Sequence, residues 1–460
     1  MTDLLQPDRG QDAHQIELVD KDGYDSWLGG QSARVRAALA AQRFRPKPFA
    51  TAILPGDQPE AWSALGVVAN TRSLSPWCLA RLAEVLPEGL YRLASGDPGV
   101  AALGWLTAQH RFGRYKAEEA PTGPRVLLTR EAAQIDPVRR LADATALVRD
   151  LVNTPAQDLG PAMLEEEAAA LAERHGATLT VTRGAPLAKE FPLVHWVGMA
   201  AAPGREPRMI ELEWGRADHP RLAIVGKGVC FDTGGLDVKP AASMRLMKKD
   251  MGGAAHALAL AGLVMAERLP VRLHLLVPAV ENAISAASTR PGDVMRSRKG
   301  LTVENTNTDA EGRLILADAL AKAVEAAPTL ILDFATLTGA ARVALGPDLP
   351  ATFANDEALA SELIEAGGRA DDPLWRLPLW DGYDDMLSSD IADLQNAPEG
   401  GMAGAVTAAL FLRRFVPGSI PWAHLDTFAW RLAAKPGRPK GGDALGLRAC
   451  WELLKARYPG

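Results

Sequence analysis

The first 135 residues carry short apolar runs that alternate with turns rich in proline and glycine. Strand-like runs lie at Val67–Val68, Leu90–Leu93 and Arg125–Leu128, and helical spacing occurs at Ser75–Leu86 and Pro98–His110. This alternation predicts a small N-terminal α/β domain over residues 1–135. The segment contains no recognisable catalytic constellation, so we expect it to serve assembly or substrate access.

The next segment has the pattern of one long helix. Apolar side chains recur at helical intervals over residues 136–151, and Asn153-Thr154-Pro155 ends the pattern because proline cannot continue a helix. The apolar positions are Val138, Leu141, Ala142, Leu147, Val148 and Leu151. We therefore predict a connecting helix over residues 136–155 between two domains.

Beyond Pro161, strand and helix patterns alternate along the chain. The predicted strands are Leu222–Val225, Val271–Val280, Leu330–Ala335 and Trp422–Asp426. The predicted helices are Gly253–Arg268, Leu314–Ala326 and Ala403–Phe415. This order predicts a larger α/β/α domain over residues 156–460, with a central mixed, mostly parallel sheet covered by helices.

Composition narrows the class of protein. At 460 residues the chain is long enough for two domains, and 47% hydrophobic with 23% charged residues is typical of a globular enzyme. A net charge of −6 gives no bulk attraction to nucleic acid or to an anionic membrane. Three widely separated cysteines argue against a disulfide framework and for a reducing compartment. Neither a signal peptide nor an apolar run of about 18 residues is present, so we expect a cytoplasmic protein.

The strongest chemical signal is the segment Asn307–Leu314, which reads Asn-Thr-Asp-Ala-Glu-Gly-Arg-Leu. If this segment is extended, Asp309, Glu311 and Arg313 share one face with Asn307. Two adjacent carboxylates repel each other unless a proton or a cation lies between them, and one arginine neutralises only one of them. The pattern therefore favours a metal site, and the alternative is an exposed acidic loop with a salt bridge.

A second signal follows the predicted strand Leu222–Val225. Gly226–Gly235 reads as a glycine-rich loop at the carboxyl end of that strand, where ligands bind in open α/β sheets. Its residue order does not match a phosphate-binding P-loop. Asp250 precedes a predicted helix and could simply cap it. The pair Gly252-Gly253 disfavours a helix, which suggests a close approach of the backbone to another group.

Taken together, these residues resemble the leucyl aminopeptidase (cytosol aminopeptidase) family. The resemblance covers about residues 149–430. The matching blocks are Gly226–Gly235, Val238–Pro240, Met247–Ala255, Asn307–Leu314 and Ala335–Ala340. Two departures stand out: Thr233 replaces the usual serine, and Thr427–Trp430 replaces small residues, which could reshape a pocket wall.

The resemblance implies a metal-dependent aminopeptidase that removes the N-terminal residue of peptides by a water activated between two divalent cations, Zn²⁺, Mn²⁺ or Mg²⁺. The implied metal ligands are Lys227, Asp232, Asp250, Asp309 and Glu311. Lys239 would polarise the scissile carbonyl, and Arg313 would hold a bicarbonate that relays a proton. The implied substrate contacts are Met247, Thr336, Leu337 and Gly339. The expected partners are peptides with a free N-terminus and copies of the same chain in a homo-oligomer, a hexamer.

Two other functions remain open from the sequence. Some bacterial members of the family also bind DNA, but the net charge and the absence of a basic run in residues 1–135 argue against it here. An inactive paralogue is disfavoured because all seven implied metal-binding and catalytic residues are present. The histidines form no His-Glu-x-x-His pair, and we expect His256 and His424 to be core residues rather than metal ligands.

Overall fold

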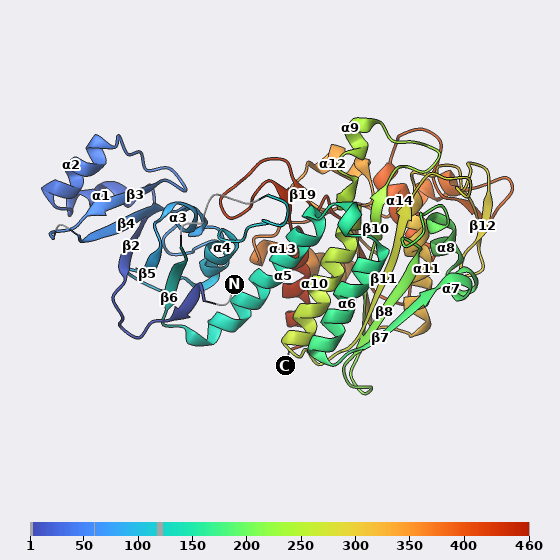
Figure 1. The fold of residues 1–460 in the computed structure, drawn as a ribbon, viewed down its shortest axis with the longest axis horizontal. Coiled ribbons are helices and arrows are strands. Elements are labelled where there is room, and N and C mark those ends of the chain that lie inside the picture. The colour runs from blue at the N-terminus through green and yellow to red at the C-terminus, as the bar shows by residue number, and fades with distance from the viewer. Residues whose placement is uncertain (1–2, 59, 117–122, 460) are drawn as a thin grey trace. The chain divides into compact units, whose positions relative to one another are not determined.

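The computed structural model describes residues 3–58, 60–116 and 123–459 (Figure 1). The chain divides into two compact units, one of Met1–Ala146 with Ala433–Lys440 and one of Leu147–Leu432 with Gly441–Gly460. The division falls inside helix α5 (Ile135–Asn153), where the sequence predicts a connecting helix. The return of Ala433–Lys440 to the first unit has no counterpart in the local sequence pattern.

The smaller unit has an α/β fold, as predicted. Among its described residues, a six-stranded sheet has the order β1-β6-β5-β2-β4-β3, and β3 alone is antiparallel to its neighbour. The strands are β1 Leu5–Pro7, β2 His14–Val19, β3 Thr51–Pro55, β4 Trp62–Val67, β5 Gly89–Leu93 and β6 Arg125–Thr129. Two separate apolar clusters cover it, one with α1 (Tyr24–Gly29) and α2 (Ala33–Ala41), the other with α3 (Ala80–Val85) and α4 (Ala102–Thr107).

Both helices predicted in the smaller unit are shorter than their apolar patterns. The pattern from Ser75 becomes helical only at Ala80, because Ser75–Cys78 closes a hydrogen-bonded turn around Pro76. The pattern from Pro98 starts as the 3₁₀ turn Gly99–Ala101 and continues as α4. Local turn chemistry therefore overrides apolar periodicity at both starts.

The larger unit is built on a mixed, mostly parallel sheet, as predicted. In the described part of the chain this sheet has nine strands in the order β16-β15-β18-β14-β9-β11-β8-β7, with β10 paired to β11. The strands are β7 Thr178–Arg183, β8 Arg208–Trp214, β9 Arg221–Gly226, β10 Gly228–Asp232, β11 Arg272–Asn282, β14 Leu330–Ala335, β15 Ala351–Ala354, β16 Trp375–Arg376 and β18 Trp422–Asp426. The central neighbours β18, β14, β9 and β11 are all parallel.

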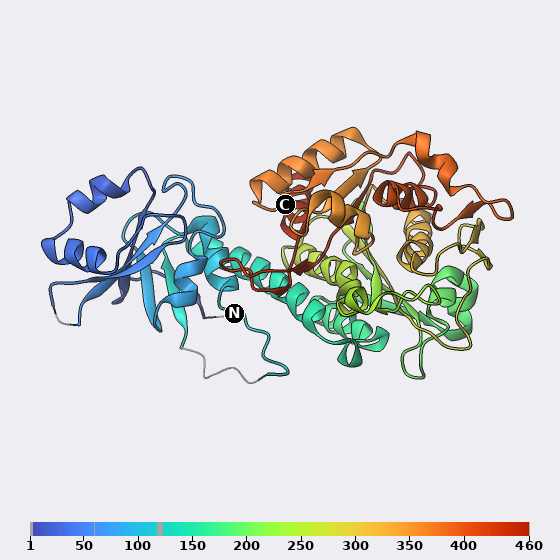
Figure 2. The ribbon, with the colours of Figure 1, turned by 90° about the horizontal axis from the view of Figure 1, so that it is seen from above.

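Helices cover both faces of this sheet (Figures 1 and 2). On one face α10 packs on β9, β14 and β11, and α6 and α15 pack on α10. On the other face α11 packs on β9 and β11 beside α8 and α14. The helices named here are α6 Pro161–His175, α8 Pro192–Gly198, α10 Gly252–Ala266, α11 Glu311–Glu325, α14 Gly404–Arg413 and α15 Leu447–Arg457.

The buried position of α10 explains its sequence. Nearly all its residues are buried, so its apolar side chains surround the helix instead of forming one stripe. Among the described residues, no helix has the length and apolar character needed to cross a membrane. The apolar run Ala254–Ala266 is therefore part of a core helix of the larger unit.

One sequence expectation about the sheet is wrong. The glycine-rich segment Gly226–Gly235 is a loop only at its end, from Thr233 to Gly235, because Gly228–Asp232 forms strand β10, which pairs with β11 in parallel. Gly226 ends β9 and Lys227 lies between the two strands. Short glycine-containing strands of this kind lack the apolar length that identifies a strand from sequence.

Candidate metal centre

The candidate site lies where the central parallel strands end. Lys227 follows β9, Asp232 ends β10, Thr336 follows β14 and Thr427 follows β18. Because the carboxyl ends of parallel strands meet at one edge of a sheet, these four positions come together although 200 residues separate the first from the last. The turn Met247–Met251, a 3₁₀ helix labelled η4, packs against β10 and reaches the same edge.

The segment Asn307–Arg313 is not extended, so that expectation is wrong. Asn307 Oδ1 accepts the Asp309 N–H at 2.8 Å and closes a turn, and Glu311 is already the first residue of α11. Asn396 Oδ1 accepts the Thr306 N–H at 2.8 Å and the Asn307 N–H at 3.2 Å. The turn before the helix is therefore held by one local side-chain oxygen, that of Asn307, and by one from a distant segment, that of Asn396.

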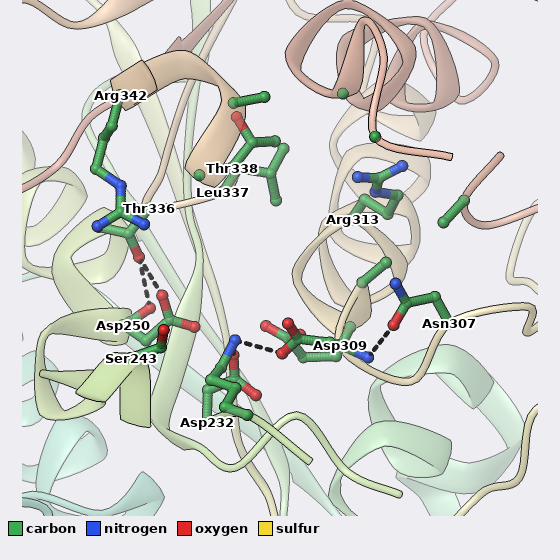
Figure 3. Close-up of a pocket in the computed structure, with 18 of the residues that line it drawn as sticks. Asp232, Ser243, Asp250, Asn307, Asp309, Arg313, Thr336, Leu337, Thr338 and Arg342 are labelled. Atoms are coloured by element: carbon green, nitrogen blue, oxygen red, sulfur yellow. Dashed lines mark hydrogen bonds and ion pairs between the residues drawn. The ribbon is translucent and has the colours of Figure 1, made fainter. Parts of the chain in front are cut away.

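All eleven residues that the sequence points to line one cavity of about 360 Å³ (Figure 3). They are Lys227, Asp232, Lys239, Met247, Asp250, Asp309, Glu311, Arg313, Thr336, Leu337 and Gly339. Three carboxylates form its centre: one oxygen from each of Asp232, Asp309 and Glu311 lies within 4.8 Å of the others. Among the His, Cys, Asp and Glu side chains of the described residues, these three lie close enough together to hold a metal ion.

The electrostatics of this group require positive charge. Burial and then the charge of Asp232 raise the pKa of Glu311 to about 8 and that of Asp309 to about 6. Glu311 Oε1 is buried and accepts no aligned hydrogen bond, and its partner is the Lys227 ammonium, which lies 3.0 Å away as an ion pair. Three carboxylates this close together, with two of them buried, are the arrangement that a divalent cation stabilises. The donor set therefore fits metal ions.

Two lysines neutralise part of this charge. Lys227 Nζ lies 2.6 Å from Asp250 Oδ2 and 3.0 Å from Glu311 Oε1. Lys239 Nζ lies 2.8 Å from Asp232 Oδ2 and also pairs with Asp309. Burial lowers the pKa of both lysines, but the surrounding carboxylates outweigh it and raise the pKa of each above its ordinary value. A neutral Lys227 amine, as a metal ligand requires, would thus need the opposing field of bound cations.

Asp250 is fixed by neighbours on two sides. Thr336 Oγ1 donates to its Oδ1 at 2.8 Å, while Lys227 holds its Oδ2. Burial raises the pKa of Asp250, but the ammonium of Lys227 and then that of Lys249 outweigh this effect and lower the pKa to about 2. Asp250 therefore stays ionised, and it lies in η4 rather than serving as the side-chain cap of α10.

Arg313 presents unused hydrogen-bond donors to the cavity. Its Nη1 donates to the Asn396 carbonyl at 2.7 Å, whereas its buried Nε has no partner. Burial lowers the pKa of Arg313 to about 10, which leaves the guanidinium charged near neutral pH. A buried cation with a free donor beside the carboxylates fits a small anion such as bicarbonate.

Two glycines allow the backbone to come this close. A Cβ on Gly312 would lie 2.5 Å from Lys227 Cε, so the lysine stem occupies the space of the missing side chain. A Cβ on Gly253 would lie 2.2 Å from the Phe334 carbonyl oxygen. The predicted reason for the Gly252-Gly253 pair, a close backbone approach, is therefore confirmed at Gly253.

Four cavity or supporting residues were not identified as such from the sequence. Asp426 accepts the N–H groups of Leu337 and Thr338 at 2.9 and 3.0 Å and fixes the loop after β14. Lys249, Arg342 and Phe428 line the cavity. Phe428 lies in the segment that departs from the family pattern, but nothing in the local sequence marks Arg342, which sits on the short helix α12 (Gly339–Leu345).

The two histidines singled out in the sequence are core residues, as expected. His256 is fully buried and its Nε2 accepts the Leu445 N–H at 3.0 Å. His424 is 1% exposed and its Nδ1 lies 2.5 Å from Asp333 Oδ1. Neither belongs to the carboxylate group described above.

Comparison with known proteins identifies the family. Residues 146–451 match the model of the cytosol aminopeptidase family, catalytic domain, and residues 15–128 match that of the M17 aminopeptidase N-terminal domain. The chain belongs to the cytosol aminopeptidase family. Members of this family are metal-dependent aminopeptidases, so the predicted enzyme class, a metalloaminopeptidase, is confirmed.

Individual relatives agree with this assignment. The chain is 43% identical over 373 residues to a protein named probable cytosol aminopeptidase from Syntrophotalea carbinolica, covering 77% of this chain and 74% of the relative. It superimposes on the crystal structure of cytosol aminopeptidase from Coxiella burnetii with a TM-score of 0.93 and 43% identity, covering 99% of each chain. The bottromycin maturation enzyme BotP in complex with Mn has a TM-score of 0.86 at 31% identity, covering 97% of this chain and 100% of BotP.

Proposed function

We propose that this family member binds two divalent cations through Asp232, Asp250, Asp309, Glu311 and Lys227 and uses them to hydrolyse N-terminal peptide bonds. The clustered carboxylates of Asp232, Asp309 and Glu311 would hold the ions, and Asp250 with Lys227 would supply the remaining ligands. The observation that carries this assignment is the group of three carboxylates, Asp232, Asp309 and Glu311, each with one oxygen within 4.8 Å of the others. Oxygen ligands with one amine suit Zn²⁺, Mn²⁺ or Mg²⁺, and BotP is a relative with Mn.

When bound, the cations would supply an activated water of lowered pKa and a positive charge for the free α-amine of the substrate. The chain's own residues do the rest. Lys239 keeps a positive charge within 2.8 Å of Asp232, where it can stabilise the oxyanion that develops on the scissile carbonyl. Arg313 would hold a bicarbonate with its unused Nε–H, and a bicarbonate held there would supply a proton-accepting group beside the carboxylates.

The substrate would lie along the cavity wall that η4 and the loop after β14 form. Met247, on η4, would contact the first side chain, and Thr336, Leu337 and Gly339 would line the path of the peptide. The carboxylate of Asp426 keeps that loop in place because it accepts hydrogen bonds from the backbone N–H groups of Leu337 and Thr338. Fixed positioning of this kind lowers the entropic part of the barrier.

The central test replaces Glu311 with glutamine. Glu311→Gln keeps the size of the side chain but removes its charge, so bound metal and activity should fall together. Glu325→Gln, an exposed carboxylate on the same helix, is the matched control and should retain both. Two metals per chain and full activity in Glu311→Gln, measured by elemental analysis and aminoacyl-anilide hydrolysis, would disprove the ligand assignment.

The two lysines should separate into different roles. Lys239→Ala should lower turnover about 10²–10³-fold with the metal content intact, which is the usual cost of losing an oxyanion donor. Lys227→Ala should instead weaken metal retention during dialysis against a chelator. Metal loss in Lys239→Ala with metal retained in Lys227→Ala would contradict this assignment and would make Lys239 the metal ligand.

The enzyme should require a free α-amine. Acetylation of a peptide removes the group that a cation holds and adds bulk at the metal, so activity should fall below detection. On free peptides activity should rise toward alkaline pH as the amine deprotonates. Efficient cleavage of the acetylated peptide by the pure protein would contradict the exopeptidase mechanism.

We also propose that the active form is a homo-oligomer, a hexamer. The supporting observation is that Val343 is 89% and Met402 83% exposed, an unusual exposure for large apolar side chains. Within the apolar, glycine- and alanine-rich stretch Gly400–Leu412, most residues from Ala405 onward are buried within the chain, so its exposed start at Gly400–Met402 is the part that another copy could contact. Light scattering of the active enzyme should give a multiple of the 49.0 kDa chain mass, and an active monomer would refute this proposal.

A further inference from the structure

Two cations of the cavity have no part in the chemistry proposed above. Arg342 Cζ lies 4.6 Å and Lys249 Nζ 5.5 Å from the centroid of the Phe428 ring. All three residues line the same cavity as the carboxylates. They come from three separate segments, the turn η4, the helix α12 and the chain after β18. Their convergence therefore depends on the tertiary fold.

Arg342, like Arg313, is a cavity cation that forms no ion pair with a carboxylate among the described residues. Lys227 and Lys239 each pair with two carboxylates, and Arg313 donates to a carbonyl. Within the described part of the chain, Arg342 has no carboxylate within ion-pair distance. Its guanidinium lies instead over the face of the Phe428 ring. Its Nη2 lies 3.5 Å from the point where a Cβ of Gly339 would sit, so the guanidinium folds back to the start of its own helix (Figure 3).

Lys249 adds a second, incompletely neutralised charge. Its side chain is 4% exposed and its Nζ lies 3.5 Å from Asp250 Oδ1, an oxygen that already accepts from Thr336. The other oxygen of Asp250 is held by Lys227 at 2.6 Å. A buried ammonium and a guanidinium beside one ring repel each other unless an anion joins them.

We propose that the pocket for the N-terminal side chain selects an acidic residue, glutamate or aspartate, whose carboxylate is bound by Arg342 with Lys249. This inference rests on the proposed function, which puts Met247 and Gly339 beside that side chain. Lys249 shares a 3₁₀ turn with Met247, and Arg342 shares a helix with Gly339. Arginine binds carboxylates through two parallel hydrogen bonds, and the face of Phe428 restricts where its guanidinium can lie.

The C-terminal carboxylate of a dipeptide is a second source of the same chemistry. It would reach Arg342 from the other end of the substrate and would make the enzyme a dipeptidase without preference for acidic residues. Aminoacyl p-nitroanilides separate the two sources because they carry no C-terminal carboxylate. Glutamyl and glutaminyl anilides have nearly the same shape and differ in charge.

The experiment compares kcat/KM for α-glutamyl, glutaminyl and leucyl p-nitroanilide in the metal-loaded enzyme. The wild type should prefer glutamyl to glutaminyl by roughly 10- to 100-fold, the range for hydrogen bonds to a charged group. Arg342→Gln should remove this preference, mainly through KM, with the glutaminyl rate and the metal content kept. Arg369→Gln, an arginine exposed on helix α13 (Glu357–Arg369), is the matched control and should keep the preference.

Three results would overturn the inference. One is equal or better hydrolysis of the glutaminyl anilide by the wild type. Another is a loss of kcat/KM in Arg342→Gln that appears with Leu-Gly but not with Leu-Gly-amide, because this result would assign Arg342 to the C-terminal carboxylate of the substrate. The third is equal binding of L-glutamate and L-glutamine by calorimetry, a measurement that needs no turnover. Absence of hydrolysis of all three anilides would instead count against the proposed function, while calorimetry would still test the acidic pocket.

Discussion

Gly312 offers a sharp test of how tightly the site is packed. It is the second residue of α11, and its missing side chain is replaced by the stem of Lys227. In Gly312→Ala the new Cβ would lie 2.5 Å from Lys227 Cε and 2.8 Å from Nζ. Ordinary carbon contacts are about 3.5–4.0 Å, so the lysine would have to move by ~1 Å.

That shift matters because the ammonium is held on several sides. Lys227 Nζ lies 2.6 Å from Asp250, 3.0 Å from Glu311 and 3.1 Å from the Thr336 carbonyl. A displacement of ~1 Å breaks the shortest of these contacts. Overpacking costs about 1–3 kcal/mol, while replacing a helical glycine with alanine gains about 0.5–1 kcal/mol. The net loss of stability should therefore be small, roughly 0–2.5 kcal/mol.

Metal binding should respond more strongly than stability. Loss of an oriented ligand or of its supporting contacts typically costs about 10–100-fold in metal affinity or activity. The assay is competition with a graded chelator, followed by elemental analysis, together with urea unfolding of the same samples. Gly368→Ala is the matched control, since it is also a helical glycine but nothing lies within 4 Å of its Cβ position. Wild-type metal affinity and activity in Gly312→Ala would refute the packing argument.

Two further predictions concern buried charges away from the cavity. Asp443 Oδ1 and Oδ2 accept from Arg149 and Arg431 at 3.0 and 2.8 Å, so Asp443→Asn should destabilise the fold by about 3–5 kcal/mol in urea unfolding, and a change below 1 kcal/mol would contradict the pairing. Burial lowers the pKa of His424, but the carboxylate of Asp333 outweighs it and raises the folded pKa above the unfolded value. The resulting stabilisation is complete below about pH 6.5 and is lost as pH rises through the folded pKa, so urea midpoints of the wild type should fall over that range more steeply than those of His424→Gln. Parallel pH profiles of the two proteins would show that His424 does not titrate with folding.

The sequence alone determined the class of fold and the inventory of the site. Leu330–Ala335 and Trp422–Asp426 have the bounds predicted for them, because strands buried between helices are short, mostly apolar runs that local pattern reveals. The cavity is lined by all eleven residues that the sequence implied, because their identities and order along the chain carry the family resemblance. Their roles as ligands and substrate contacts remain predictions.

Some local geometry could not be read from the pattern. Strand β10 exists because it pairs with β11, a partner that lies 40 or more residues further along the chain. The turn at Asn307 exists because Asn396 accepts its backbone hydrogens from a distant segment. In both places a contact remote in sequence decided between two conformations that the local residues allow.

The composition of the pocket wall was decided by tertiary structure alone. Lys249 and Arg342 are ordinary charged residues in their own segments, where a lysine or arginine normally faces water. Their meeting at Phe428 follows from the parallel strands β14 and β18, whose carboxyl ends bring positions 342 and 428 beside the turn η4. Local sequence specifies which charge a residue carries, but only the packing of the sheet specifies which charges share one low-dielectric cavity.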